Sequence, residues 1–206
     1  MSAKDISNYL TNLQWDGKSR IDSWLTIALG AEEKSVNTSD IGRKFLIGCV
    51  ARALNPGCKF DNILLLEGEQ GTGKSAAIQI LFGHWFTSAT SDFKTNEWVK
   101  QIIDYWCCEL CELETITLDE QLKLKSFLSR QSDMYRPAFS RFPREEKRLT
   151  VFVATTNQVE FLADKHGNRR FWPVRCSQAD LQWLQANRDQ LWAEAHHLYN
   201  NGEAWW

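Results

Sequence analysis

The sequence of 206 residues lacks any apolar run close to the roughly 20 residues that a membrane-spanning helix needs. Its first ten residues, MSAKDISNYL, also lack the apolar segment of a secretory signal peptide. We therefore expect a cytoplasmic protein without a membrane partner. Internal repeats and low-complexity segments are absent too. The composition, with 43% apolar and 24% charged residues, is that of an ordinary folded protein.

An excess of charge of one sign is also missing. The formal net charge is −2, so the chain as a whole gives no indication of a nucleic-acid partner. The charge is unevenly distributed, however, because residues 130–175 hold ten Lys or Arg against five Asp or Glu. This basic segment fits either a phosphate-binding face or an ordinary solvated surface.

A second pair of metal ligands is lacking around the CxxC motif formed by Cys108 and Cys111. A tetrahedral zinc site needs four ligands, and no other pair with matching spacing stands out. Cys107 and Cys108 also lie in an apolar run, where cysteine behaves as a small hydrophobic residue. We therefore expect the six cysteines to be reduced thiols without zinc.

Helical patterns fill the N-terminal quarter of the chain. Residues 19–22, Ser-Arg-Ile-Asp, resemble a capping box at the start of a helix that carries Trp24 on its apolar side. Residues 38–40 offer N-caps for a further helix, which Asn-Pro-Gly at 55–57 ends. We interpret residues 1–55 as a helical N-terminal domain.

The pattern changes after residue 56, where short apolar runs alternate with helical stretches. Strands are expected at 62–66, 105–108, 149–154 and 171–174. Helices are expected at 75–82, 94–103 and 118–130, and a long helix after 178. This alternation is typical of a parallel sheet between two helical layers. The predicted fold is an α/β three-layer core over 56–176 and a C-terminal helix over 177–206, which a longer protein could continue.

GEQGTGKS, residues 68–75, fits the P-loop pattern between a strand and a helix, so the predicted core is that of a P-loop NTPase. Glycines let backbone N–H groups turn toward phosphate oxygens, and the helix N-terminus adds positive charge. Lys74 is expected to reach the β and γ phosphates of ATP, and the Ser75 hydroxyl to hold Mg²⁺. The expected ATP-contacting residues are Gly68, Glu69, Gln70, Gly71, Thr72, Gly73, Lys74, Ser75 and Ala76. The alternative is a glycine-rich loop without a ligand.

Acidic residues follow the second apolar strand. Glu109 is expected at the carboxyl edge of the sheet, where it would act on Mg²⁺ directly or through water. Glu112 lies one turn further on and is our candidate for the base that orients the attacking water. Glu114 is a rival for that role, and either could be an ordinary loop carboxylate.

Asn157 ends the strand of residues 151–157, VFVATTN. A polar side chain at that place in an NTPase sheet can touch the γ-phosphate and the attacking water, so Asn157 is a candidate sensor. The alternative is a strand-end asparagine in a turn. The sequence that follows is not Asn-Lys-x-Asp, so guanine specificity is unsupported.

These residues carry a resemblance to a known family. The chain is similar to the virulence-associated protein E family, P-loop ATPases of phages and mobile islands that are related to superfamily 3 helicases. The resemblance rests on LQWDG at 13–17, NPGCK at 55–59, the P-loop, CELCEL at 108–113, KSFL at 125–128, DMYR at 133–136, TTN at 155–157 and GNRRFW at 167–172. It implies an AAA+-like core, Mg-dependent ATP hydrolysis, a homo-oligomer that forms a hexameric ring, and a role in replicating mobile DNA. A primase or another replication protein is the implied partner.

The resemblance also implies a DNA-contacting hairpin between residues 130 and 149, and Pro137 and Pro143 suit bends in such a segment. Single-stranded or forked DNA is the expected ligand. The candidate residues are Arg136, Arg141, Arg144, Lys147 and Arg148. The alternative is a solvated connector.

Arg169 and Arg170 fall in the connection between the strand that ends near Asn157 and the strand that begins at Phe171. In ring-forming ATPases of the class that the resemblance implies, an arginine near there points to the nucleotide of the neighbouring subunit. We expect one of the two to do so. The other is expected to make a structural ion pair, with Asp164 as a candidate partner.

The leading interpretation is therefore the ATP-hydrolysing motor domain of a replicative helicase. A small-molecule kinase would also use a P-loop, but no segment is typical of a lid over a phosphoryl acceptor. An interaction protein that uses ATP as a switch is the non-enzymatic alternative. Stimulation of ATP hydrolysis by single-stranded DNA would distinguish the helicase motor from the kinase. Turnover measured beside ATP affinity would distinguish the helicase motor from the ATP switch.

Overall fold

The computed structural model describes residues 3–32, 37–89, 96–111, 113, 117–137, 139–157 and 168–206. The helices are α1 Ala3–Asn12, α2 Trp24–Leu29, α3 Thr38–Leu54, α4 Lys74–Phe82, α5 Asn96–Ile102, α6 Leu118–Leu128 and α7 Leu181–Asn200, with 3₁₀ turns η1 Gly83–Trp85 and η3 Asn168–Arg170. The strands are β1 Ile63–Glu67, β2 Phe86–Ala89, β3 Cys107–Leu110, β4 Ser132–Tyr135, β5 Arg144–Lys147, β6 Val151–Thr156 and β7 Phe171–Arg175.

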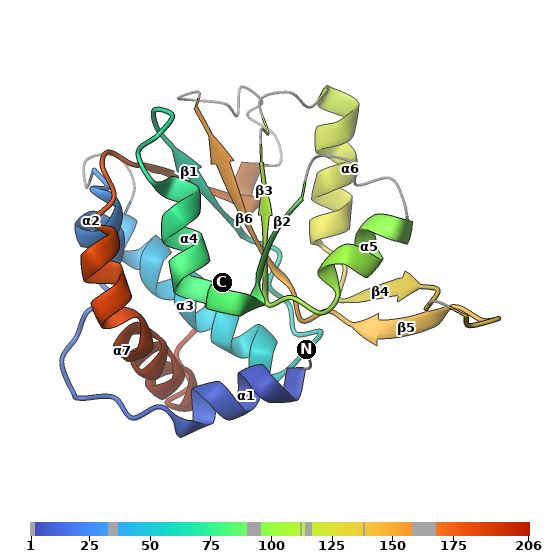
Figure 1. Cartoon of the computed structure of the whole chain (residues 1–206), viewed down its shortest axis with the longest axis horizontal. Helices are drawn as coiled ribbons and strands as arrows, with labels where there is room; N and C mark the ends of the chain where they lie inside the picture. The colour runs from blue at the N-terminus through green and yellow to red at the C-terminus, as the bar shows by residue number, and fades with distance from the viewer. Residues whose placement is uncertain are drawn as a thin grey trace.

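Five strands form one sheet in the order β2-β3-β6-β1-β7, and every neighbouring pair is parallel. The predicted α/β class and parallel sheet are confirmed. Because all five strands run the same way, their carboxyl ends meet at one edge, the upper edge in Figure 1. The edge strand β2 was not predicted, since its four residues are largely half-exposed and show no continuous apolar run.

Helices cover both faces of the sheet, with α1, α2, α3, α4 and α7 on one side and α5 and α6 on the other (Figure 1). The side chains of β1 alternate between these layers. Leu64 and Leu66 belong to the core on the α4 side, and Ile63 and Leu65 belong to the core on the α6 side. A strand that is apolar on both faces reads as a continuous hydrophobic run, and LLL within β1 is such a run.

Tryptophans join the C-terminal helix to the sheet. The rings of Trp106, just before β3, and Trp192 in α7 lie 4.4 Å apart, and both contact Phe82 at 5.2 Å. Both of these indole N–H groups are hydrogen-bonded: Trp106 donates to the carbonyl of Cys49 and Trp192 to that of Leu81. The first and last helical segments therefore share one core with the strand that carries Glu109.

The buried carboxylate of Glu194 in α7 holds the segment before α2. It accepts hydrogen bonds from the Ser19 hydroxyl at 2.7 Å and from the backbone N–H groups of Arg20 at 2.7 Å and Ile21 at 3.0 Å. The predicted capping box at 19–22 is therefore wrong: the Ser19 side chain bonds to a distant helix, and α2 begins at Trp24. A partner 175 residues away cannot be read from local sequence.

No helix among the described residues is long and apolar enough to cross a membrane.

We expect Glu194→Ala to lower the free energy of unfolding by about 2–4 kcal/mol, because it leaves two backbone donors without an acceptor in a buried site. Glu194→Gln keeps one oxygen acceptor and should cost clearly less. Urea unfolding of both variants beside the parent measures the difference. Equal losses in the two variants would contradict this expectation, because Gln keeps both the side-chain volume and one acceptor oxygen.

Candidate functional site

The glycine-rich loop lies between β1 and α4 at the carboxyl edge of the sheet (Figure 1). Gly71 and Gly73 have φ angles of 84° and 90°, in the left-handed region that favours glycine. Gly73 is also the N-cap of α4, so the loop runs directly into the first turn of that helix. Backbone N–H groups at a helix N-terminus have no partner within the helix, and this makes the loop suited to an anion.

Lys74 is the first residue of α4, and its side chain folds back over the loop. Its ammonium group donates to the carbonyls of Gly68 and Glu69, at 2.7 Å each. Only 7% of the residue is exposed. The one cation of the loop is thus held at the centre of the site by the loop's own backbone.

Glu109 of β3 is the meeting point of three elements. Its Oε1 atom accepts hydrogen bonds from the Ser75 hydroxyl of α4 at 2.6 Å and from the Thr155 hydroxyl of β6 at 2.8 Å. The carboxylate is 2% exposed. The predicted neighbourhood of Ser75 and Glu109 is therefore present in the structure, whereas Thr155 was missed. Its only signal was its place beside Asn157 at the end of an apolar strand.

Lys74, Ser75 and Thr155 line an open cavity of about 360 Å³, and Glu109 is hydrogen-bonded to the last two. Asn157, just past the end of β6, is exposed and contributes to its wall, as the sequence predicted from its strand-end position. The lining residues are Gln70, Gly71, Thr72, Gly73, Lys74, Ser75, Ala76, Cys111, Thr155, Thr156 and Asn157. Glu112 and Glu114, the two candidates for the base, lie outside the described residues.

Cys108, beside Glu109 on β3, is a buried thiol. Burial raises the pKa of the Cys108 thiol, and the nearby Cys111 and Glu109 raise it further. A protonated thiol is a poor ligand, because metals bind the thiolate. Among the described residues, no group of three or more His, Cys, Asp or Glu side chains could hold a metal ion.

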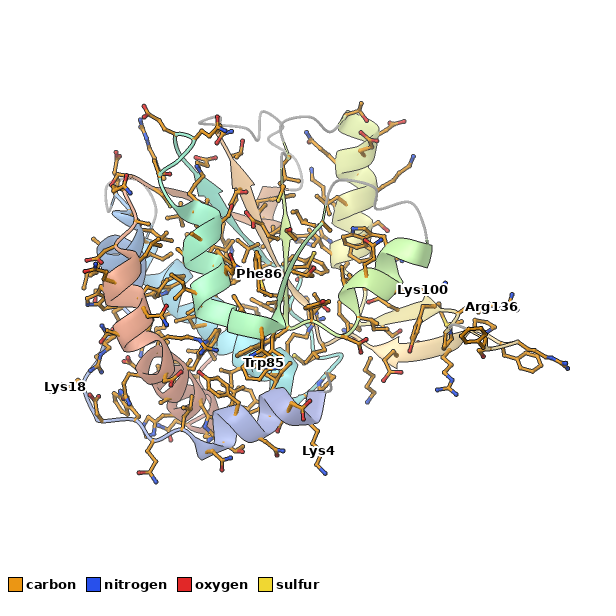
Figure 2. The ribbon with its side chains drawn as sticks, in the orientation of Figure 1. Lys4, Lys18, Trp85, Phe86, Lys100 and Arg136 are labelled. Atoms are coloured by element: carbon orange, nitrogen blue, oxygen red, sulfur yellow. The ribbon has the colours of Figure 1, made fainter. Side chains whose placement is uncertain are left out.

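A two-stranded antiparallel hairpin, β4 and β5, protrudes from the opposite end of the molecule to α7 (Figure 1). Four of the five candidate DNA-binding residues are exposed on it or on the loop that joins its strands. They are Arg136, Arg141, Arg144 and Lys147. Figure 2 labels Arg136 there, far from Lys18 on the other side of the molecule.

Arg148 is the exception, and it does not belong to this surface. The residue is 2% exposed, and its guanidinium forms an ion pair with Asp133 and donates to the carbonyl of Phe127 at 2.7 Å. The same group lies over the ring of Phe127, 4.1 Å from its centroid. Arg148 therefore fixes the base of the hairpin to the last turn of α6, and its fully satisfied charge is unavailable to DNA.

Arg169 and Arg170 have different surroundings. The Nε group of Arg170 donates to Asp61 at 3.2 Å and to the Ser129 hydroxyl at 3.0 Å, so Arg170 makes the expected in-chain ion pair. Its partner is Asp61, whereas Asp164 lies outside the described residues. The side chain of Arg169 is exposed, and its backbone carbonyl accepts a hydrogen bond from Asn62 at 3.2 Å.

Comparison with known sequences identifies the family. A model of the virulence-associated protein E-like domain matches residues 10–206, and the chain therefore belongs to this family, as its motifs predicted. No curated protein matches the chain.

Solved structures of the NrS-1 C-terminal region have a similar fold. One apo structure, of the A form, superposes with a TM-score of 0.62 at 15% identity, covering 91% of this chain and 48% of that chain. A second apo structure gives a TM-score of 0.57 at 15% identity, covering 92% and 47%. The chain thus spans about half the length of these structures, and at this identity the likeness concerns the fold alone.

Proposed function

We propose that this chain is the Mg-dependent, ATP-hydrolysing motor domain of a replicative DNA helicase of phages or mobile islands, with an AAA+-like P-loop core. The observation that carries the proposal is the convergence of the glycine loop, Lys74, Ser75 and Asn157 on one cavity, with Glu109 hydrogen-bonded to Ser75. Family membership supports a role in replication, and the NrS-1 likeness supports the fold.

Each wall of the cavity suits one part of a nucleoside triphosphate. The loop and the start of α4 offer backbone N–H groups and Lys74 to the phosphates, which would draw the ammonium away from the Gly68 and Glu69 carbonyls. Asn157 borders the same space from β6 and is placed to hydrogen-bond a terminal phosphate or a water beside it. Glu112 remains our candidate for the base.

The Ser75 and Glu109 side chains fit a magnesium ion. Mg²⁺ prefers oxygen ligands and is usually held by one or two protein side chains together with phosphates. The Ser75 hydroxyl and the Glu109 carboxylate supply such oxygens 2.6 Å apart, and the bond from Thr155 restrains the carboxylate. When bound, the ion would neutralise charge that develops on the phosphates.

The exposed cations of the hairpin are proposed to contact single-stranded or forked DNA. Arg136, Arg141, Arg144 and Lys147 lie on a projection that the buried Arg148–Asp133 pair anchors to the body. A rigid base fixes where the exposed charges lie, which limits the entropy lost on binding a phosphate chain.

Arg169 is proposed to act on the nucleotide of a neighbouring subunit in a hexameric ring. Arg170 is occupied by Asp61 and Ser129 within its own chain, whereas Arg169 is exposed beside it on the same 3₁₀ turn. The in-chain contacts of Arg170 would hold that turn in place. An arginine supplied across an interface in this way accelerates phosphoryl transfer by on the order of 10³–10⁵.

We expect Lys74→Ala to abolish ATP hydrolysis, because it removes the positive charge at the proposed phosphate site. Lys123→Ala, which removes an exposed lysine of α6, should leave hydrolysis unchanged. Saturating Mg-ATP, at a hundredfold excess over Kd, should stabilise the parent by about 3 kcal/mol and the Lys74 variant by much less. Steady-state phosphate release and thermal melting check both parts, and turnover by the variant at the rate of the parent would refute the P-loop assignment.

Mixing two inactive variants tests the neighbouring-subunit role of Arg169. Lys74→Ala keeps its Arg169, and Arg169→Ala keeps its P-loop, so mixed rings should recover part of the activity. The matched control replaces Lys74→Ala by the double variant Lys74→Ala with Arg169→Ala, which cannot supply the arginine and should restore no activity to Arg169→Ala. Failure to complement in mixtures shown by mass measurement to co-assemble would mean that Arg169 does not act across an interface.

The salt dependence of single-stranded DNA binding tests the proposed role of the hairpin. Arg144→Gln with Lys147→Gln should weaken single-strand binding and flatten the slope of log K against log salt by about 1.4, or roughly 0.7 for each lost phosphate contact. Lys4→Gln with Lys18→Gln removes the same charge away from the hairpin (Figure 2). This pair should leave the slope close to that of the parent, and equal effects of the two pairs would contradict a specific hairpin surface.

A further inference from the structure

Two phenylalanines stand in solvent at the end of the hairpin. Phe139 is 108% exposed relative to an extended reference, and Phe142 is 76% exposed. Both lie in the loop between β4 and β5, whose described residues 136, 137 and 139–143 we call the hairpin tip. Large apolar side chains in water lose the free energy that burial would provide, so a pair of them on one short loop suggests a missing partner.

The backbone at Phe139, in the hairpin tip, adopts a conformation that costs free energy. Phe139 has a φ angle of 63°, in the left-handed region that residues other than glycine seldom adopt. Hydrogen bonds keep this geometry: the Ser140 hydroxyl donates to the carbonyl of Phe142 at 2.9 Å, and Arg136 Nε donates to the carbonyl of Ser140 at 2.7 Å. Such a conformation persists only where the surrounding structure maintains it, and it is common where a ligand is bound.

The charge of the tip indicates what the partner is. The segment from Arg136 to Arg144 contains three arginines and no Asp or Glu, and Arg136, Arg141 and Arg144 are all exposed. A purely apolar protein surface would have to bury these guanidinium groups without counter-charges, which is costly. A partner that combines flat aromatic faces with regularly spaced negative charges matches both features at once.

We propose that Phe139 and Phe142 stack on unpaired nucleobases of the DNA strand whose phosphates the tip arginines contact. The inference rests on the proposed DNA-binding role of the hairpin and adds to it the part of the nucleic acid that is recognised. The bases of a duplex are already stacked and paired, so the tip selects single strands over double strands. Every base has a π face, so the contact carries little sequence preference.

The test compares oligothymidylate with an abasic strand of the same length and backbone, at one low salt concentration, by fluorescence anisotropy. The parent should bind the base-containing strand more tightly, by about 5- to 150-fold for each stacked base. Phe139→Gly and Phe142→Ala together should remove this preference while leaving affinity for the abasic strand unchanged. Arg141→Gln with Arg144→Gln should weaken binding to both strands and leave their ratio intact.

Three further variants separate a binding role from a structural one. Phe139→Gly relieves the left-handed strain, so its melting temperature should match or exceed that of the parent even as base preference falls. Phe142→Trp keeps a flat ring and should keep the preference. Met134→Ala removes another exposed apolar side chain, on β4 of the same hairpin, and should change neither affinity nor ratio.

The outcomes distinguish this inference from the proposed function. If the arginine pair weakens DNA binding but the phenylalanine pair leaves the base preference intact, stacking is refuted and the hairpin still binds DNA. If neither pair changes DNA binding, the DNA role of the hairpin itself is refuted. If the phenylalanine pair changes the oligomeric mass and not the base preference, the rings dock on a neighbouring protein subunit instead.

Discussion

The burial of the parallel sheet on both faces is the constraint from which the other features follow. A parallel sheet leaves no solvent-facing side, so its inner strands must be largely apolar and helices must cover both surfaces. The chain meets this requirement with two separate cores, and α7 reaches across to complete the larger one through Trp192. Because crossovers return each strand in the same direction, all polar strand ends gather at one edge.

Polar residues at that edge lie in the last positions of otherwise apolar strands. Glu109, Thr155 and Thr156 are buried among hydrophobic neighbours, and the first two are tied together by a hydrogen bond of 2.8 Å. A carboxylate in such surroundings is costly unless several donors satisfy it. Ser75 and Thr155 provide two of them, so the arrangement is already organised around the place where a cation would sit.

Features that depend on a pattern within one helix, strand or loop could be predicted from the sequence. The apolar run before the glycine-rich loop, that loop itself, Glu109 and Asn157 were located because strand and helix periods are local and the carboxyl edge follows from a parallel sheet. The contacts that the sequence missed all join distant segments. Ser19 bonds to Glu194, and Arg148 turns inward to Asp133 because the adjacent Phe127 and Phe152 rings provide a buried face for its guanidinium. A charged residue between strands is usually solvated, and only the tertiary structure shows which one is not.

The last turn of α6 connects the two surfaces proposed to meet other molecules. Its Phe127 carbonyl accepts a hydrogen bond from Arg148 at the base of the hairpin, and the Ser129 hydroxyl that follows it accepts one from Arg170. Arg170 belongs to the same 3₁₀ turn as the exposed Arg169. If the nucleotide of a neighbouring subunit displaced that 3₁₀ turn, the shift would reach α6 through the Arg170–Ser129 hydrogen bond. It would then reach the hairpin base through the Arg148–Phe127 hydrogen bond, because packed helices move as rigid units. The in-chain pairing of Arg170 would therefore also make the hairpin responsive to the proposed nucleotide site of the neighbouring subunit.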